Sequence, residues 1–276
     1  MAGVANGQCP VVRIQRPGLW VRSRFLGLIP VFRNECQHPG TMHVFFVHEL
    51  SGDLLSLPGE ESRHCAKVLR LRPGDEVAVT DGKGLWALAA IEEAHPKSSM
   101  VKVIQRKEAY GKRPFRLHMA VAPTKSIDRF EWFLEKATEC GIDEITPVFC
   151  AYSERRVIKP HRLEKILVAA MKQSLRAYLP KLNPAIELQD FLQHPVPEHA
   201  FMAHCAEGEK QTLAGSYQTG EDLTVLVGPE GDFSPAEIEA ATDAGYRAIS
   251  MGSHRLRTET AAMALCVQAN TINGLL

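Results

Sequence analysis

The chain has 276 residues, a net charge of zero, 45% hydrophobic and 23% charged residues, which is the composition of an ordinary globular protein. No apolar run approaches the roughly 20 residues that cross a bilayer, and the glycines and prolines show no period, so membrane-spanning, collagen-like and low-complexity classes are excluded. Seven cysteines without a Cys-x-x-Cys pair, and eleven histidines without a His-x-x-x-His spacing, disfavour a disulfide framework and a metal site. We therefore expect reduced thiols, no bound metal and a cytoplasmic protein.

Residues 1–41 differ from the rest of the chain. They hold five arginines against one acid, Glu35, and show no hydrophobic periodicity. We expect an N-terminal extension, disordered or loosely packed, upstream of the strand pattern that starts at Met42. The alternative is an organellar transit peptide, which would be Arg-rich and acid-poor as here but also Ser-rich, whereas only Ser23 is present.

Between Met42 and Arg106 the sequence predicts short strands joined by tight turns, as in a small β-barrel. The polar segment Glu108–Pro114 predicts a boundary between a domain of residues 42–110 and a domain of residues 111–276. The expected elements are strands at Val44–Val47, Glu76–Thr80, Leu85–Ile91 and Met100–Gln105, and an amphipathic helix at Glu60–Leu71.

After residue 111 strands alternate with helices, which predicts a parallel α/β sheet. Ser234-Pro235-Ala236-Glu237 is a capping box with proline at the first helical position, and Thr258 can cap the last helix. The expected strands are Leu117–Ala122, Glu144–Cys150, Ala200–Ala203, Leu223–Val227 and Arg247–Met251. The expected helices are Asp128–Cys140, Pro160–Tyr178, one from Pro235 to Gly245, and Thr258–Ile272.

The zero net charge hides separated basic and acidic segments. Residues 97–116 hold seven Lys or Arg and one Glu, and residues 154–181 hold eight Lys or Arg and two Glu. Residues 182–246 hold twelve acids and one basic residue, Lys210. Such a chain can present a positive face to a polyanion, and solvated helix faces explain the charges equally well.

Two glycine-bearing loops follow predicted strands and precede helices. They are Gly228-Pro-Glu-Gly231 and the segment from Ser250 to Ala261, which contains Gly252. Ligands of parallel sheets bind beyond the carboxyl ends of strands, and glycine lets the main chain approach a ligand closely. Dinucleotide and P-loop patterns are absent, and an acid inside the Gly-x-x-Gly disfavours a KH-type loop. Either loop alone could simply be a tight turn that caps a helix. Because both loops occur together, each between a strand and a helix, a ligand site is favoured.

The segments Gly228-Pro-Glu-Gly-x-Phe-Ser and Leu256-Arg-Thr-Glu-Thr-Ala261 resemble the C-terminal signature of SPOUT-class RNA methyltransferases. The best match is the RsmE family, which methylates N3 of a uridine in 16S ribosomal RNA. Further similar stretches are Glu131–Gly141, Met171–Arg176 and His64–Arg70 followed by Pro73-Gly-Asp75, so that the resemblance covers residues 42–276. The family often has Glu where this chain has Lys172, Gly where it has Leu175, and Arg where it has His43.

The resemblance implies a PUA-like RNA-binding barrel followed by an α/β trefoil-knot (SPOUT) methyltransferase domain. It also implies a homodimer that acts on 16S ribosomal RNA in the small ribosomal subunit, with S-adenosyl-L-methionine as cofactor. The residues expected to bind this cofactor lie in three loops: Ala203, His204, Gly228, Pro229, Glu230, Gly231, Met251, Gly252, Leu256 and Thr260.

Methylation of uracil N3 requires loss of the N3 proton or stabilisation of charge on O2 or O4. We expect Arg257 to supply this stabilisation, because its guanidinium is always charged and planar; an ion pair with Glu259 is the alternative. Glu259 is the second expected catalytic residue, as a base or an orienter, although a carboxylate in the first helical turn also stabilises the helix dipole. Glu230 is likewise a candidate for the base or for a residue that orients the substrate.

The target base must be unpaired or flipped, and basic side chains would hold the flanking phosphates. A SPOUT methyltransferase acting on another RNA, and a catalytically silent RNA-binding ribosome-assembly protein, remain alternatives. The residues expected to bind RNA are Arg63, Lys67, Arg70, Arg72, Lys125, Arg155, Arg156 and Arg176.

Overall fold

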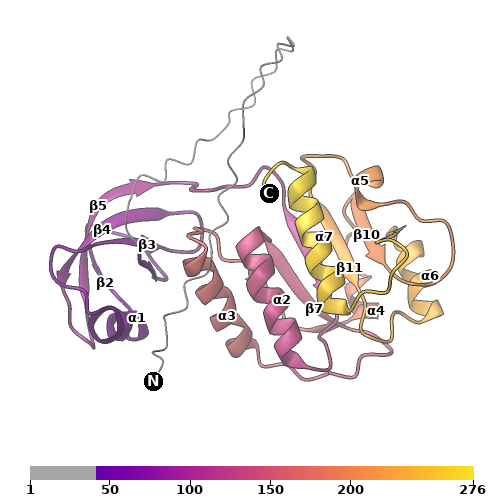
Figure 1. Cartoon of the computed structure of the whole chain (residues 1–276), viewed down its shortest axis with the longest axis horizontal. Coiled ribbons are helices and arrows are strands. Elements are labelled where there is room, and N and C mark those ends of the chain that lie inside the picture. The colour runs from indigo at the N-terminus through magenta and orange to yellow at the C-terminus, as the bar shows by residue number, and fades with distance from the viewer. Residues whose placement is uncertain (1–41) are drawn as a thin grey trace, which may run out of the picture. The chain divides into compact units, whose positions relative to one another are not determined.

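The computed structural model describes residues 42–276, so the extension expected over residues 1–41 lies outside the described residues. Two sheets organise the described part (Figure 1). One has five strands and belongs to the N-terminal segment, and the other has seven strands and belongs to the C-terminal segment.

The five-stranded sheet has the order β1-β3-β4-β5-β2, with β1 parallel to β3 and the other pairs antiparallel. Four strands agree with the sequence prediction, and the three-residue β2 was missed because it is too short to show an alternating pattern. Strands β1 and β2 form the two edges, so hydrogen bonding does not close the expected barrel. The strands are β1 (Val44–Phe46), β2 (Leu54–Ser56), β3 (Glu76–Thr80), β4 (Trp86–Glu93) and β5 (Met100–Lys107).

The helix predicted at Glu60–Leu71 consists of two parts. An α-helical turn, α1 (Gly59–Arg63), continues directly into a π-helix, η1 (His64–Leu69). Arg70 ends it with a left-handed backbone, φ 56°. Cys65 is fully buried and packs among the apolar side chains of the five-stranded sheet, so the helix covers the inner face of that sheet.

The seven-stranded sheet is parallel throughout, as the alternation of strands and helices predicts. Its order is β12-β10-β11-β6-β7-β8, and β9 also pairs with β7. The two-residue strands β8 and β9 were not predicted. The strands are β6 (Leu117–Val121), β7 (Glu144–Phe149), β8 (Lys181–Leu182), β9 (Ile186–Glu187), β10 (His199–Ala203), β11 (Leu223–Val227) and β12 (Arg247–Ile249).

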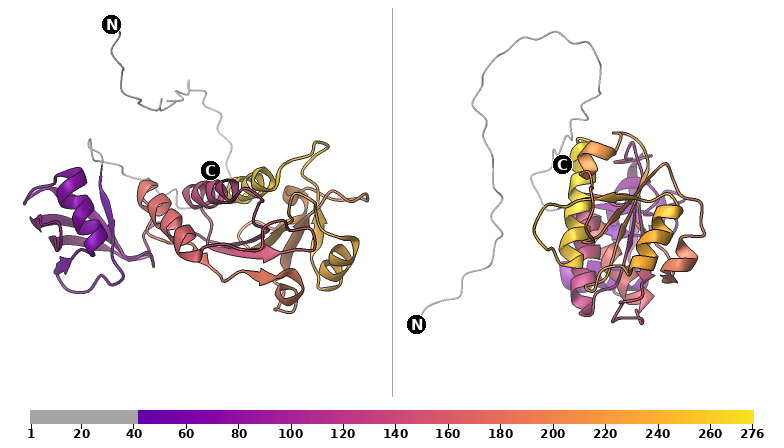
Figure 2. Two further views of the ribbon diagram at one scale, coloured as in Figure 1. Left: turned by 90° about the horizontal axis from the view of Figure 1, so that it is seen from below. Right: turned by 90° about the vertical axis from the view of Figure 1, so that its right-hand side faces the viewer.

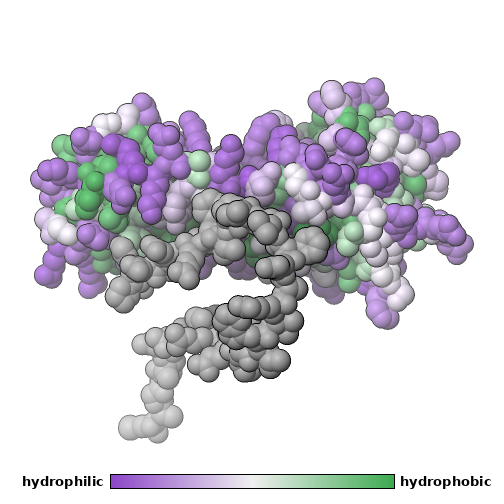
Figure 3. All heavy atoms as spheres, turned by 90° about the horizontal axis from the view of Figure 1, so that it is seen from above, coloured by the Kyte–Doolittle hydropathy of each residue, from purple (hydrophilic) through white to green (hydrophobic). Residues whose placement is uncertain are grey.

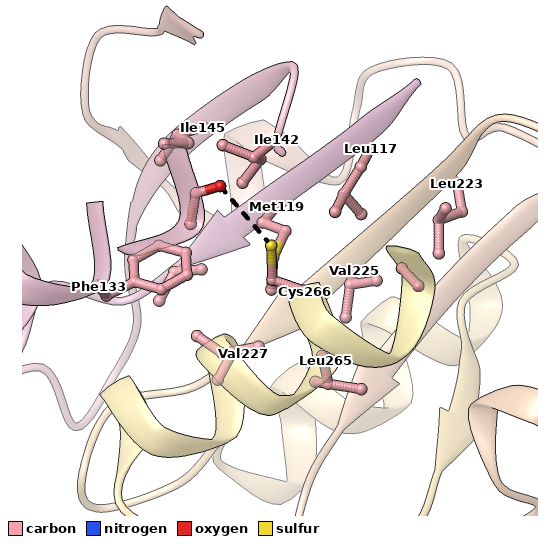
Figure 4. Packing of buried hydrophobic residues seen from close by; sticks show 14 of the residues in the cluster. Leu117, Met119, Phe133, Ile142, Ile145, Leu223, Val225, Val227, Leu265 and Cys266 are labelled. Atoms are coloured by element: carbon pink, nitrogen blue, oxygen red, sulfur yellow. Dashed lines mark hydrogen bonds between the residues drawn. The ribbon is translucent and has the colours of Figure 1, made fainter. Parts of the chain in front are cut away.

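Helices cover both faces of this sheet (Figure 2, right). Along β6, Leu117 and Met119 face the α2–α7 side, whereas Ala120 belongs to the core on the opposite side. Figure 4 shows Met119 beside Cys266 of α7, and Leu117 and Leu265 belong to the same core. The first layer contains α2 (Ile127–Cys140), α3 (Pro160–Gln173), α5 (Leu213–Ser216) and α7 (Thr258–Ile272). The second layer contains α4 (Leu188–Phe191) and α6 (Pro235–Asp243).

The start of α6 was predicted correctly because a local capping pattern specifies it. The capping box of α6 is present: Ser234 accepts from the backbone of Glu237, whose carboxylate accepts from Ser234 N–H. Several helix boundaries were wrong by one to five residues, including the start of α2 and the end of α6. Helix α3 ends at Gln173 rather than Tyr178, because Leu175 adopts a left-handed φ of 55°. The N-cap of α7 is Arg257, and Thr258 is its first helical residue.

The two sheets are connected by main-chain hydrogen bonds between the β3–β4 turn and the segment after α3. Gly84 N–H donates to the carbonyl of Ala177 at 2.9 Å, and Leu179 N–H donates to the carbonyl of Gly82 at 2.8 Å. Nearby, Lys172 Nζ lies 2.6 Å from Glu61 Oε1, with both side chains largely shielded from solvent. These contacts fix α3 against the five-stranded sheet.

None of the described helices is long and apolar enough to cross a membrane. Within residues 42–276 no group of three or more His, Cys, Asp or Glu side chains is arranged to hold a metal ion. The face drawn in Figure 3 is mostly hydrophilic, with hydrophobic residues gathered at its left, over the five-stranded sheet.

Candidate functional site

A cavity of about 730 Å³ opens at the carboxyl ends of β10, β11 and β12. Its size lies within the range of small-molecule sites, and its position is the usual one for ligands of parallel sheets. Its lining comes from the loops that follow the three strands and from the first turn of α7: Ala203, His204, Cys205, Lys210, Val227, Gly228, Pro229, Glu230, Asp232, Ile249, Ser250, Met251, Gly252, Ser253, His254, Arg255, Leu256, Arg257, Thr258 and Ala261.

The structure brings eight of the ten expected cofactor-binding residues to this cavity. Gly231 and Thr260 do not line it, although each is adjacent in sequence to a residue that does. The eight are Ala203, His204, Gly228, Pro229, Glu230, Met251, Gly252 and Leu256.

Two glycines of the cavity are required for different reasons. Gly252 has φ 99°, a conformation that residues with a side chain rarely adopt. Gly228 is buried and has no positive φ; a Cβ atom there would lie 3.0 Å from Cε2 of Phe233. The space beside Gly228 is therefore already occupied by a ring that belongs to the core.

Asp232 connects two of the cavity loops and was not singled out from the sequence. Its Oδ2 accepts a hydrogen bond from Cys205 N–H at 2.7 Å, and its own φ is 65°. A non-glycine residue with this φ costs free energy, which surrounding contacts must offset. No sequence signal could have found the contact, because its partners are 27 residues apart and meet only when β10 and β11 pair.

Glu230 joins a further loop to the site. Its Oε1 accepts a hydrogen bond from Lys125 N–H at 2.9 Å, so the segment after β6 is tied to the loop after β11. Since Glu230 also lines the cavity, its second carboxylate oxygen is the one that remains for a ligand.

His204 lies at the cavity wall, and its Nδ1 is buried without a hydrogen-bond partner among the described residues. Burial, and secondarily the charge of Lys210, lowers the pKa of this imidazole and so favours its neutral form. A neutral imidazole with a buried, unpaired nitrogen can exchange a hydrogen bond with a polar group in the cavity.

Arg257 and Glu259, the two expected catalytic residues, lie in different surroundings. Arg257 is exposed and lines the cavity as N-cap of α7. The ion pair between Arg257 and Glu259 that we considered is not among the ion pairs of residues 42–276. Instead Glu259 Oε1 lies 3.8 Å from Arg129 Nε, and its buried Oε2 has no hydrogen-bond partner in the same range. Glu259 does not line the cavity, which favours an orienting role over direct contact.

The expected RNA-binding residues fall into two groups. Those of the α1–η1 segment and its following loop are exposed, and their side chains make no hydrogen bond or ion pair within the described part of the chain: Arg63, Lys67, Arg70 and Arg72. Those of the second sheet are engaged in the fold: Lys125 with Glu154, Arg155 with the carbonyls of Thr124 and Lys125, Arg156 with Glu187, and Arg176 with the carbonyl of Glu139.

Arg176 is the most enclosed of this second group. Its Nε and Nη2 donate to the carbonyl oxygen of Glu139 at 3.0 and 2.8 Å. Burial, followed by the neighbouring charge of Arg113, lowers the pKa of its guanidinium. In the structure Arg176 thus fixes the end of α2, and its contact with RNA stays a prediction.

Two family models match the chain, an RNA methyltransferase PUA domain at residues 57–104 and an RNA methyltransferase domain at residues 111–270. A curated relative, ribosomal RNA small subunit methyltransferase E of Rickettsia conorii, is 31% identical over 80% of this chain and 91% of its own length.

Two solved structures are similar to this chain over nearly their whole length. A probable rRNA-methyltransferase from Porphyromonas gingivalis is 38% identical, with a TM-score of 0.78, over 84% of this chain and 99% of that one. A ribosomal RNA small subunit methyltransferase E from Neisseria gonorrhoeae, bound to S-adenosyl methionine, is 25% identical, with a TM-score of 0.74, over 84% of this chain and 98% of that one.

Proposed function

The chain belongs to the ribosomal RNA small subunit methyltransferase E family, and from this premise we propose that it methylates N3 of a uridine in 16S ribosomal RNA with S-adenosyl-L-methionine as donor. The observation that carries the proposal is the cavity at the ends of β10, β11 and β12, which gathers most of the residues expected to bind the cofactor. An enzyme with this activity needs a site for the donor, a group that stabilises charge on the base, and a surface for RNA.

The cavity residues fit the donor. Main-chain groups near Gly252 are accessible because this position carries no side chain, and Gly228 lines the cavity from the end of β11. Pro229, Met251 and Leu256 offer apolar surface to a nucleoside, and Glu230 offers a carboxylate to a hydroxyl or ammonium group. When bound, S-adenosyl-L-methionine supplies a methyl group on a positively charged sulfur.

Arg257 is the residue we assign to the acceptor base. Loss of the N3 proton to the solvent or to a carboxylate leaves negative charge on N3, O2 and O4 of the uracil, and the incoming methyl group neutralises it. A guanidinium stabilises that anion until the transfer, without changing its own protonation. Arg257 is exposed at the cavity and makes no ion pair within residues 42–276, so its donors are available. Glu259 orients this region from the buried side of α7, where Arg129 is its nearest charge.

Single-stranded or flipped RNA is the expected substrate form, because base pairing hides uracil N3. The exposed basic residues of the α1–η1 segment lack side-chain partners within the described part and are suited to phosphate contacts. Such contacts supply affinity and register rather than base recognition.

For the architecture, we propose that residues 42–110 and 111–276 are the two domains and that the second is a trefoil-knot SPOUT domain. After the edge strand β12, the chain returns across the sheet so that α7 packs against α2 and against β6 and β11. A trefoil knot requires such a return, because the end of the chain must pass back through a loop formed earlier in the chain. Knots of this kind are rare among folds. A crystal structure traced without breaks through residues 223–276 tests the proposal: α7 must pass through the loop that precedes it.

A homodimer in the cytoplasm is the proposed state of the protein. Trp132 on α2 and Val267 on α7 are exposed apolar side chains on two helices that pack together, which suits a subunit interface. Free, mostly shielded thiols such as Cys65 and Cys266 suit a reducing compartment. Sedimentation equilibrium tests the oligomeric state, and a monomer at micromolar concentration contradicts it.

Nucleoside mass spectrometry of ribosomal RNA tests the activity. A strain that lacks the protein should lose N3-methyluridine from its 16S ribosomal RNA and regain it with the wild-type gene. Persistence of the modified nucleoside contradicts the proposal. Calorimetry with S-adenosyl-L-methionine distinguishes the methyltransferase from the alternative, a catalytically silent RNA-binding protein. The silent protein would bind RNA but not the methyl donor.

A further inference from the structure

The loop that follows β7 holds an exposed aromatic residue close to the cavity. Tyr152 is 52% exposed and makes no side-chain hydrogen bond or ring contact within residues 42–276. It lies at the same edge of the sheet as the cavity, because β7 is parallel to β6 and, through it, to β11.

The backbone around Tyr152 is held firmly. Cys150 N–H donates to Ser153 Oγ at 2.9 Å, and Ser153 N–H donates to the carbonyl of Cys150 at 3.0 Å. Ala151 N–H donates to Glu237 Oε1 at 2.8 Å, which attaches the loop to the first turn of α6. The residues on both sides of Tyr152 are therefore fixed by bonds to other atoms, whereas the ring itself is left free.

The same loop is attached to the segment after β6. Arg155 Nε donates to the carbonyl of Thr124 at 3.0 Å, and Lys125 Nζ lies 2.7 Å from Glu154 Oε2. Lys125 N–H in turn donates to Glu230, which lines the cavity. A short path of hydrogen bonds thus connects the Tyr152 loop to the cavity wall.

Gly231 provides the direct contact. A Cβ atom on Gly231 would lie 2.8 Å from Cβ of Tyr152 and 3.5 Å from its Cγ. Tyr152 consequently packs with the base of its side chain against the main chain of Gly231, between the cavity-lining residues Glu230 and Asp232. Gly231, which was expected to bind the cofactor and does not line the cavity, has a different structural reason to be glycine.

We propose that Tyr152 is a stacking platform for an unpaired nucleobase of the RNA substrate, at or next to the methylated uridine. The inference rests on the proposed function. An unpaired base exposes both of its faces, and stacking on an aromatic ring replaces the neighbours it has lost. A fixed loop with a free ring provides such a surface at little cost in ordering. Lys125 and Arg155 on the neighbouring segments add positive charge close to Tyr152, that of Lys125 being compensated by Glu154.

The test compares Tyr152→Phe, which keeps an aromatic ring, with Tyr152→Leu, which keeps apolar bulk against Gly231 but cannot stack in the same way. Val157→Ala, at a 74% exposed residue of the same connection, is the matched control. The substrate is 30S subunits from a strain lacking the protein, and a fluorescein-labelled oligouridylate serves as a separate binding probe. Cofactor affinity, the melting temperature and the sedimentation coefficient are measured for every variant.

Tyr152→Leu should lower kcat/KM for the 30S substrate and the affinity for oligouridylate by about 10-fold or more, as expected for loss of one base–aromatic stack. Tyr152→Phe and Val157→Ala should stay within about 3-fold of wild type, with cofactor affinity, melting temperature and sedimentation unchanged in all variants. Equal activity of the Leu and Phe variants overturns the proposal. So does a loss that follows cofactor affinity, stability or subunit association.

Failure of the proposed function gives a different result. If the wild-type protein binds oligouridylate but methylates no ribosomal RNA, the assigned reaction is wrong, and the affinities of the Leu and Phe variants still decide whether Tyr152 stacks on bases. If the wild-type protein binds neither RNA, both proposals fail.

Discussion

Gly228 and Phe233 are in such close contact that a Cβ atom on Gly228 would lie 3.0–3.3 Å from three atoms of the Phe233 ring. We expect Gly228→Ala to displace this buried ring and to lower both cofactor affinity and stability, the latter by about 1–3 kcal/mol, as in other overpacked cores. Gly59→Ala, where a Cβ has no neighbour within 4 Å and φ is not positive, should change neither. Calorimetry and urea unfolding measure the two effects. Wild-type affinity in Gly228→Ala would place the cofactor elsewhere.

Arg257→Ala should affect the chemical step. If the guanidinium stabilises charge on the uracil, its removal should reduce the single-turnover rate at saturating RNA by about 10²–10³. Stability should not change, because Arg257 is exposed and has no ion pair within the described residues. Arg255→Ala, in the same loop and also at the cavity, is the comparison. An equal loss in both variants would indicate a general effect of positive charge, and a lower RNA affinity with an unchanged rate would indicate a phosphate contact.

Two neighbouring ion pairs join α1 to α3, and they should differ in their effect on stability. Lys172 and Glu61 have side chains that are only 22% and 11% exposed, whereas Lys165 and Glu60 are 53% and 81% exposed. Lys172→Met would leave the shielded Glu61 carboxylate without its cation and with only a long hydrogen bond from Phe46 N–H, which should cost about 1–3 kcal/mol of the free energy of unfolding. Lys165→Met should have no measurable effect. Urea denaturation measures the free energy of unfolding of both variants. Equal losses would show that burial of the ion pair does not determine its contribution to stability.

Acid should destabilise the second sheet through His118. Burial, followed by the charges of Arg116 and Lys181, lowers the pKa of this imidazole from 6.5 to about 4. The unfolded chain therefore binds more protons between pH 6.5 and pH 4, so the stabilisation by neutral His118 is complete above this window and is lost as the pH falls through it. From pH 7 to pH 5 the loss should be on the order of 1–2 kcal/mol.

His118→Gln removes this titration and keeps a polar group within reach of Thr146, which lies 2.7 Å from His118 Nε2. The variant should show a flatter dependence of stability on pH over the same window. Identical slopes for variant and wild type, measured by urea unfolding at several pH values, would assign the acid sensitivity to other groups.

Most of the fold could be predicted because its determinants are local. Alternating strands and helices indicated the parallel sheet, and Ser234 with Glu237 specified the start of α6. The end of α3 could not be predicted in the same way. Residues after Gln173 continue to favour a helix, and the left-handed Leu175 is maintained by the contacts of the following segment with the β3–β4 turn. The short strands β8 and β9 depend on that change of direction and were missed with it.

The candidate site was predictable to the extent that it consists of contiguous loops. The glycine-bearing segments around Gly228 and Gly252 come together because β11 and β12 both neighbour β10. Asp232 and Tyr152 were not predicted as site residues, because each acts through a contact with a residue distant in sequence. Asp232 contacts Cys205, and Tyr152 contacts Gly231. The surroundings of Arg176 were equally hidden, since its contact with Glu139 depends on how the chain after α3 packs on α2.

The bonds from the β3–β4 turn to Ala177 and Leu179 have a consequence for the polypeptide once it is cut. The connection near Gly111 and Lys112 is exposed and therefore open to a protease. A nick there removes the covalent link but leaves the main-chain hydrogen bonds and the Glu61–Lys172 pair intact. The two fragments should remain together on a sizing column as a non-covalent complex, and separate only when a denaturant releases them.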